Sequence, residues 1–312
     1  MAHCPDFQFE RTEQWAALPP GESFVDVCAI RIDERDHVWV LSRGREPIME
    51  FDRHGERLAA WGSEHFNGRP HGMQLADDGT MWCTDDEAHR ILRFDRNGEL
   101  LTTIESPDSP SATGFRPADS YWTALASITQ SAGPFNRPTG VTPGPDDRIY
   151  VADGYGNARI HVFDDTGSHL ESWGEPGAEV GAFRLPHAIT CHDDNLWVAD
   201  RENSRIQAFA PDGVAVAEWI DLIRPTDICF ADGVAYVPEF ACRVSILDHE
   251  GTVLARLGPD AGCETPFVAP HTVAVDRHGD LYVGEVSVTY AGIDRGANTI
   301  QKFHRIDGDR TE

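Results

Sequence analysis

Short apolar runs separated by turn residues recur along the whole chain. Six of these runs carry an aromatic residue at their third place, and they span residues 37–40, 80–83, 148–151, 195–198, 234–237 and 280–283. A further strand-like run follows at residues 90–94, 159–163 and 205–209. Short aromatic and β-branched runs at this spacing are typical of four-stranded antiparallel blades. The pattern therefore predicts an all-β fold, a six-bladed β-propeller.

The sixth repeat stops after its third strand, near Phe303, and lacks an outer strand. Residues 7–15, at the other end of the chain, look like a fourth strand. Pairing this N-terminal strand with the sixth blade would close the ring and cover an exposed strand edge. Residues 1–312 are then predicted to form a single propeller domain.

Residues 108–134 interrupt the repeat between the second and third blades, with Ser, Pro and Gly around Tyr121 and Trp122. Long loops in compact domains are often functional, so this insertion is either a lid or wall of a site or a surface excursion. Arginines also recur at the start of third strands, at Arg90, Arg159, Arg205 and Arg243. We expect them to form ion pairs between blades with the acidic residues that follow second strands.

Pro-His pairs open the second, fourth and sixth repeats at His71, His187 and His271, whereas Thr139 and Thr226 take this position in the third and fifth. In a ring of six blades, equivalent positions of alternate blades lie about 120° apart around the axis. Three imidazoles converging there predict a metal site with an open coordination position. The other histidines do not share this repeat position, and we expect them at the surface.

The predicted topology brings further polar side chains to the same face. In an antiparallel blade, the entry into strand one and the link between strands two and three emerge on one side. Arg43, Tyr155 and Arg201 lie in such links of blades one, three and four. They are therefore predicted to face the same mouth of the propeller as the three histidines.

Charge and cysteine content narrow the possible partners and compartment. Lys+Arg 26 against Asp+Glu 52 gives a formal net charge of -26. This charge disfavours binding to nucleic acid and to anionic membranes. It also fits the solvated surface of a salt-adapted bacterial protein. The first residues lack a secretory signal, and no apolar run approaches the length of a membrane span. The seven cysteines are scattered without a CxxC pair, so we expect a cytoplasmic protein with reduced thiols.

Residues 153–160, 183–187 and 198–207 resemble the lyase domain of peptidylglycine α-amidating enzymes, a six-bladed propeller of NHL-type repeats. The resemblance includes residues 43–48 and 69–72 and covers nearly the whole chain. It implies cleavage of an N-acyl-α-hydroxyglycine into a primary amide and glyoxylate. The site residues that it implies are zinc ligands at His71, His187 and His271, a catalytic tyrosine at Tyr155, an arginine near the substrate carboxylate at Arg43, and an arginine beside the tyrosine at Arg201.

The chain departs from this family at two places. Thr272 follows the third histidine, where the family has an aspartate that helps to hold a structural calcium, so a calcium ion stays an open question. Gly156 and Ala208 stand where the family has disulfide cysteines, in agreement with a reduced compartment.

The implied reaction needs a base, positive charge for the oxyanion and an anchor for the carboxylate of a small-molecule substrate. A free tyrosine titrates at about pH 10, so it acts as a base only where cations favour its phenolate. Arg43, Arg201 and a metal dication would supply this charge, and an arginine fork suits a carboxylate. Two alternatives stay open: a metal-dependent hydrolase or hydratase on a small carboxylate substrate, and a non-catalytic NHL propeller that serves as a protein-interaction scaffold.

Overall fold

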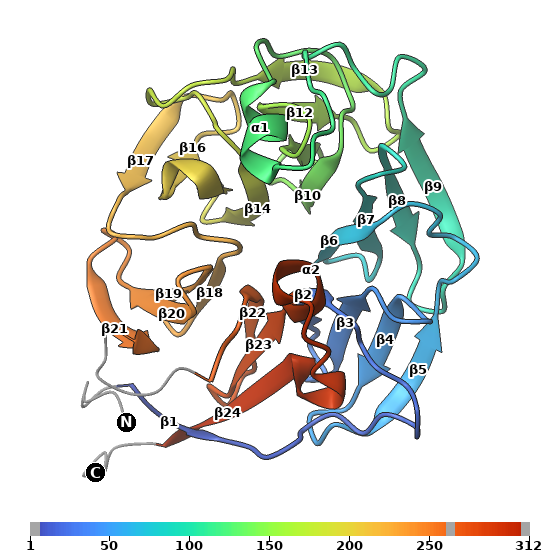
Figure 1. The fold of residues 1–312 in the computed structure, drawn as a ribbon, viewed down its shortest axis with the longest axis vertical. Helices are drawn as coiled ribbons and strands as arrows, with labels where there is room; N and C mark the ends of the chain where they lie inside the picture. The colour runs from blue at the N-terminus through green and yellow to red at the C-terminus, as the bar shows by residue number, and fades with distance from the viewer. Residues whose placement is uncertain (1–6, 260–265, 307–312) are drawn as a thin grey trace. The chain divides into compact units, whose positions relative to one another are not determined.

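The computed structural model describes residues 7–259 and 266–306, which form six four-stranded antiparallel sheets and few helices. The predicted six-bladed β-propeller is confirmed, with each sheet a blade (Figure 1). The chain divides into two compact units, which are described separately. The first unit contains residues 1–63 and 221–312, and the second contains residues 64–220.

The first unit holds the first, fifth and sixth blades. The first blade consists of β2 (Val27–Ile32), β3 (Val38–Ser42), β4 (Ile48–Phe51) and β5 (Arg57–Trp61). The fifth consists of β18 (Cys229–Ala231), β19 (Val234–Glu239), β20 (Arg243–Leu247) and β21 (Val253–Leu257). The sixth consists of β22 (Pro270–Val275), β23 (Leu281–Glu285), β24 (Ile300–Ile306) and β1 (Gln8–Arg11), with the short helices α2 (Ser287–Ala291) and η3 (Gly296–Thr299) between β23 and β24.

The N-terminal strand completes the sixth blade, as the sequence predicts. β1 pairs antiparallel with β24, with Gln8 opposite Ile306 and Arg11 opposite Phe303. Phe7 packs into the same apolar cluster as Phe303, and Trp15 lies edge-on to Tyr282 with ring centroids 5.2 Å apart. The segment therefore contributes both backbone hydrogen bonds and buried aromatic surface.

Deletion of residues 1–16 should destabilise the protein as a whole. It removes the β1–β24 ladder and two buried aromatic side chains, each of which contributes about 1.5–3 kcal/mol. We expect the melting temperature to fall by at least about 5 °C in a thermal melt. Deletion of residues 1–6 alone spares β1 and serves as the control. Equal melting temperatures for the 1–16 deletion and the full-length chain would show that this strand adds nothing to stability.

The second unit holds the second, third and fourth blades. The second blade consists of β6 (Pro70–Leu75), β7 (Met81–Asp85), β8 (Arg90–Phe94) and β9 (Leu100–Glu105), and α1 (Tyr121–Ala126) follows it. The third consists of β10 (Pro138–Pro143), β11 (Ile149–Asp153), β12 (Arg159–Phe163) and β13 (His169–Trp173). The fourth consists of β14 (Pro186–His192), β15 (Asn195–Asp200), β16 (Arg205–Phe209) and β17 (Ala215–Trp219), with η1 (Arg201–Asn203) before β16.

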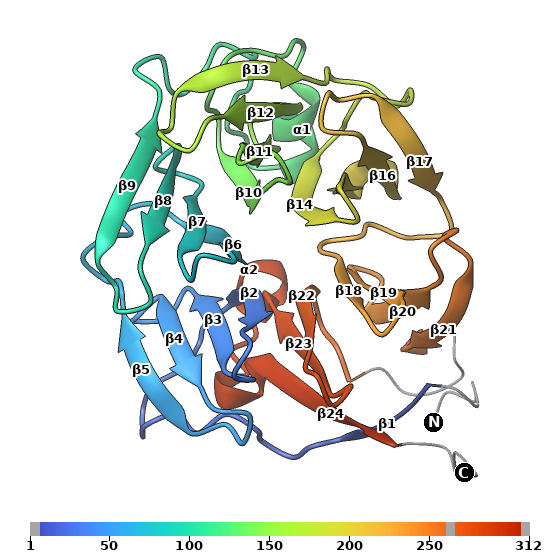
Figure 2. The same ribbon diagram turned by 180° about the vertical axis from the view of Figure 1, so that it is seen from behind.

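Within this unit the first strands of the blades are neighbours. β10 contacts both β6 and β14, and the fourth strands β9, β13 and β17 form the opposite edges of their sheets (Figure 2). Aromatic side chains of the second strands fill the space between blades: Trp82 and Tyr150 are fully buried, and Tyr150 packs with Phe183 and Phe209. These aromatics mark the repeat in the sequence because large rings fix the packing of one blade on the next.

The prediction of ion pairs between blades is wrong, because these arginines pair with acidic residues of their own blade. Asp85 lies directly opposite Arg90 in the β7–β8 ladder, and their side chains form an ion pair of 3.1 Å. Arg205–Asp200 and Arg243–Glu239 follow the same rule, at 3.0 and 2.8 Å. The register of adjacent strands therefore places each charge beside its partner.

The third blade replaces this ion pair with a buried histidine. His161 is fully buried, with Nε2 3.2 Å from Asp153 Oδ2 and Nδ1 2.7 Å from Ser172 Oγ. Arg159 donates instead to the backbone oxygens of Ala132 and Ser172. The prediction that all histidines outside the Pro-His set lie at the surface is therefore wrong for His161. Because His161 follows Arg159 by two residues on the same strand, its ring lies on the same face of the sheet as Asp153.

No helix among the described residues is long and apolar enough to cross a membrane. Five cysteines of the described ranges form no disulfide: Cys28, Cys83, Cys191, Cys229 and Cys242. The expectation for Cys4 and Cys263 concerns positions outside the described residues.

Candidate active site

Each histidine of the Pro-His set is the second residue of the first strand in its blade. His71 lies on β6, His187 on β14 and His271 on β22, and all three side chains are buried. The register with the second strand shifts at each of these places, so each histidine lies in a β-bulge. A bulge re-aims a side chain that regular pleating would direct into the core. The bulges explain how a strand residue can present its ring to a site.

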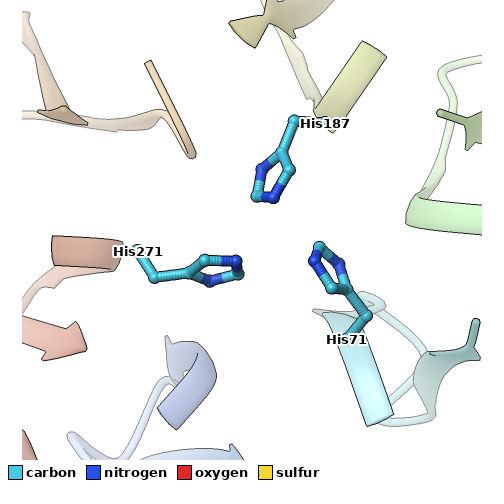
Figure 3. Close-up of side chains that lie close together, drawn as sticks. All are labelled: His71, His187 and His271. Atoms are coloured by element: carbon cyan, nitrogen blue, oxygen red, sulfur yellow. The ribbon is translucent and has the colours of Figure 1, made fainter. Parts of the chain in front are cut away.

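The three imidazoles form a group that could hold one metal ion (Figure 3). Their ligand nitrogens all lie within 4.8 Å of one another. His71 Nδ1 lies 2.7 Å from the backbone oxygen of Thr139, and His271 Nδ1 lies 2.9 Å from that of Cys28. Because a carbonyl oxygen only accepts, both Nδ1 atoms carry the proton and both Nε2 atoms keep a lone pair. This is the tautomer that a metal ligand requires, so the donor set fits a divalent ion.

Threonines of the intervening blades support the strands that carry the histidines. Thr139 Oγ1 donates to the backbone oxygen of Pro186, 2.6 Å away, which directly precedes His187. Thr226 Oγ1 lies 3.2 Å from the backbone oxygen of Pro270, which directly precedes His271. The sequence shows this alternation of histidine and threonine, but it does not show that one residue type positions the other.

Tyr155 meets two of the histidines in the second unit. Its link between β11 and β12 places the hydroxyl 2.9 Å from His71 Nε2 and 3.3 Å from His187 Nε2. Arg201 Nη1 donates to the same oxygen at 3.5 Å. The structure thus brings together four residues that the sequence places in three different blades.

Three guanidinium groups surround the Tyr155 ring. The Cζ atoms of Arg69, Arg137 and Arg201 lie 5.0, 5.3 and 5.6 Å from its centroid. Burial lowers the pKa of Arg69, but Asp86 and Tyr155 outweigh burial and raise this pKa above its ordinary value. The group therefore stays charged beside the phenol.

Arg69 and Arg137 share one carboxylate. Their Nη2 atoms lie 2.7 and 3.0 Å from the fully buried Asp86. Sequence reasoning missed both arginines as site residues. The signal was the Arg-Pro pair that opens the second and third repeats.

The insertion supplies a second tyrosine to the site. Tyr121, on α1, accepts a hydrogen bond from Arg201 Nη2 at 2.7 Å and donates to Glu202 Oε1 at 2.8 Å. Arg201 Nε also donates to Glu202, at 2.9 Å. Leu125 belongs to an apolar cluster that Tyr155 borders. Segment 108–134 therefore packs beside Tyr155 and Arg201, and its role as a lid or wall of a site stays a prediction.

Arg43 lies in the first unit, in the link between β3 and β4. Its Nη1 donates to Asp26 Oδ2 at 3.0 Å and to Thr289 Oγ1 at 2.8 Å. Asp26 is buried and also accepts the backbone N–H groups of Val288 and Thr289 on α2. These contacts fix the guanidinium on α2, and its role toward a substrate carboxylate stays a prediction.

The residues around Thr272 do not fit a calcium site. Thr272 Oγ1 donates to Asp227 Oδ2 at 2.7 Å, and Arg31 Nη1 forms an ion pair with the same oxygen at 3.0 Å. Calcium takes six to eight oxygen ligands, with carboxylates supplying most of the charge. Here a guanidinium already neutralises the carboxylate next to Thr272.

Comparisons with known proteins find NHL repeats in the chain and lyases among its relatives. The NHL repeat family matches residues 135–163 and 183–209, in the third and fourth blades. The peptidyl-alpha-hydroxyglycine alpha-amidating lyase 2 of Drosophila melanogaster is 30% identical over 80% of the chain and 58% of its own length. The chain therefore carries NHL repeats and is similar to an amidating lyase over most of its length. This similarity extends well beyond the two repeats that the family model covers.

Two further relatives are similar over most of the chain. The peptidylglycine alpha-amidating monooxygenase of Rattus norvegicus is 26% identical over 96% of the chain, which spans about a third (32%) of that enzyme. The NHL repeat-containing protein 3 of Mus musculus is 25% identical over 85% of the chain and 75% of its own length. A streptogramin B lyase structure has a TM-score of 0.62 at 17% identity, covers 96% of this chain and 98% of that one, and shows the shared fold.

Proposed function

We propose that the protein is a zinc-dependent lyase that cleaves a small N-acyl-α-hydroxyglycine, or a related carbinol bearing a carboxylate, into an amide and a glyoxylate-type aldehyde. The observation that carries this proposal is the position of the Tyr155 hydroxyl. It lies within hydrogen-bond reach of two histidine nitrogens and of a buried arginine. The 30% identity to a fly amidating lyase gives independent support.

His71, His187 and His271 would hold the metal through ring nitrogens. Three neutral imidazoles suit zinc, and an ion with three protein ligands keeps a position for a substrate oxygen. Such an ion acts as a Lewis acid and favours the ionised form of a nearby hydroxyl. Thr139 and Thr226 would keep two of the ligands in place through the backbone oxygens that precede them.

Tyr155 is the base in this proposal. Its phenolate oxygen accepts the proton of the carbinol hydroxyl, the hydroxyl oxygen becomes the aldehyde carbonyl, and the C–N bond breaks. The amide nitrogen takes up one proton, so the products are a primary amide and the aldehyde without net uptake of water. Arg69, Arg137 and Arg201 lie around the ring and stabilise negative charge on its oxygen.

The substrate carboxylate needs a cationic partner. Arg43 is our candidate, because Asp26 and α2 fix its guanidinium in one orientation. A planar guanidinium binds both oxygens of a carboxylate, which also orients the carbinol carbon. Arg201 is the less suitable anchor, since Glu202 and Tyr121 already occupy its Nε and Nη2.

Product analysis separates this function from the alternatives. The zinc-loaded protein should convert N-benzoyl-α-hydroxyglycine into benzamide and glyoxylate in equal amounts, measured by chromatography and an aldehyde assay. N-benzoylglycine, which lacks the hydroxyl, is the matched negative control. Products that contain an added water would instead indicate a hydrolase or hydratase. An absence of turnover would leave the non-catalytic scaffold.

A further inference from the structure

A cavity of about 450 Å³ lies beside the insertion in the second unit. One side comes from Trp122, Leu125 and Ile128 of segment 108–134. The other side comes from Pro176, Ala178 and Phe183, in the connection between the third and fourth blades. Of the described residues that line it, Arg184 alone carries a charge. An apolar recess of this size is typical of a small-molecule site.

The cavity shares its wall with the proposed catalytic residues. Leu125 and Ile128 line it and also form the apolar cluster that Tyr155 borders. Trp122 lies edge-on to Tyr121, with ring centroids 5.2 Å apart, and the Tyr121 hydroxyl is bonded to Arg201. One layer of side chains therefore connects the recess to the tyrosine and arginine of the site.

We propose that this cavity binds the acyl group of the substrate, so that the enzyme selects hydroxyglycines with a bulky, uncharged apolar acyl group. The inference rests on the proposed function and specifies the substrate class for that site. With the carbinol at Tyr155, the acyl group is the only part of the substrate that varies and that gains from apolar surroundings. A cavity built from tryptophan, leucine, isoleucine and phenylalanine side chains stabilises an aromatic or branched aliphatic group and disfavours a charged one.

The chemistry of the cavity favours the acyl group over a protein partner. The recess is bounded by the insertion on one side and by residues 176–184 on the other, and its volume of about 450 Å³ leaves room for an aromatic acyl group. The chain carries a net charge of -26, yet no carboxylate is among the described residues that line this recess. The lining therefore suits an uncharged apolar group better than a charged one.

The test compares two substrates that differ only in the acyl group, N-acetyl- and N-phenylacetyl-α-hydroxyglycine. The native protein should prefer the phenylacetyl substrate by about 10- to 100-fold in kcat/KM, the usual range for filling an apolar pocket. Ala178→Trp places an indole in the cavity and should reduce this ratio about tenfold or more. Ala118→Trp makes the same substitution in the insertion at an exposed residue outside the lining, and its ratio should equal that of the native protein.

The outcomes separate this inference from the function on which it rests. No aldehyde from either substrate overturns the proposed lyase activity itself. Cleavage of both substrates with a ratio near one, or a preference that Ala178→Trp leaves unchanged, overturns the acyl cavity and leaves the lyase standing. A fall in the ratio for both tryptophan variants would also contradict the proposal, because it would show that the effect does not depend on filling the cavity.

Discussion

Tyr155→Phe should lower kcat about 10²- to 10⁴-fold, the usual loss when a general base is removed. The substitution deletes one oxygen and keeps the ring, so the contacts with the three guanidinium groups and with the apolar cluster persist. The melting temperature should therefore change little. Measurement of kcat, KM and metal content on one preparation would show loss of the chemical step with retention of the fold and the ion.

Tyr121→Phe is the matched control, because both tyrosines contact Arg201. Burial raises the pKa of Tyr121 above its ordinary value even though Arg201 acts against it. Its hydroxyl donates to Glu202, so it is a poor base at neutral pH. We expect Tyr121→Phe to retain kcat within about tenfold. If Tyr155→Phe kept full turnover while Tyr121→Phe lost it, the roles of the two tyrosines would have to be exchanged.

The fold could be predicted because the repeat carries strong local signals. The predicted third strands 90–94, 159–163 and 205–209 coincide with β8, β12 and β16. The prediction succeeded since each blade repeats an aromatic anchor on its second strand. The N-terminal strand could be placed for the same reason, because the sixth repeat lacks a strand that residues 8–11 supply.

The positions of the site residues followed from topology, but their contacts did not. Alternating Pro-His pairs and the links between second and third strands identified His71, His187 and Tyr155 as neighbours. The β-bulge at each histidine is a matter of register, and no single residue type announces it. The role of Thr139 as a support for His187 depends on a hydrogen bond from its hydroxyl to the backbone oxygen of Pro186 in the next blade.

The site residues that could not be predicted from the sequence escaped prediction for a physical reason: their roles depend on contacts in three dimensions. Arg69 and Arg137 stand in the sequence as turn residues before a proline, and their convergence on Asp86 becomes visible only in three dimensions. Tyr121 lies in a segment outside the repeat, so no equivalent position in another blade indicates its role. His161 was misplaced because histidine has no fixed preference for surface or core when a carboxylate such as Asp153 is near.

His187→Ala should abolish stoichiometric binding of the metal. Two imidazoles make a weak site, so the metal content after dialysis should fall from about one ion per chain to a small fraction of one. Ligand binding to the folded state raises stability by about 2.7 kcal/mol at a hundredfold excess over Kd. A chelator should therefore lower the melting temperature of the native protein and leave that of the variant unchanged. Elemental analysis and paired melts with and without chelator measure both effects.

Two variants make this prediction specific to the three-histidine site. His54→Ala removes an exposed histidine and should keep one ion per chain and the full response to chelator. Thr139→Val removes the hydroxyl that holds the backbone oxygen before His187, and it should weaken metal affinity about 10- to 100-fold without abolishing binding. Metal affinity should therefore decrease from the native protein to Thr139→Val and further to His187→Ala. This order distinguishes loss of a ligand from loss of the residue that supports it. If His187→Ala bound metal as the native protein does, or if the native protein bound none, the three histidines would not be the metal site.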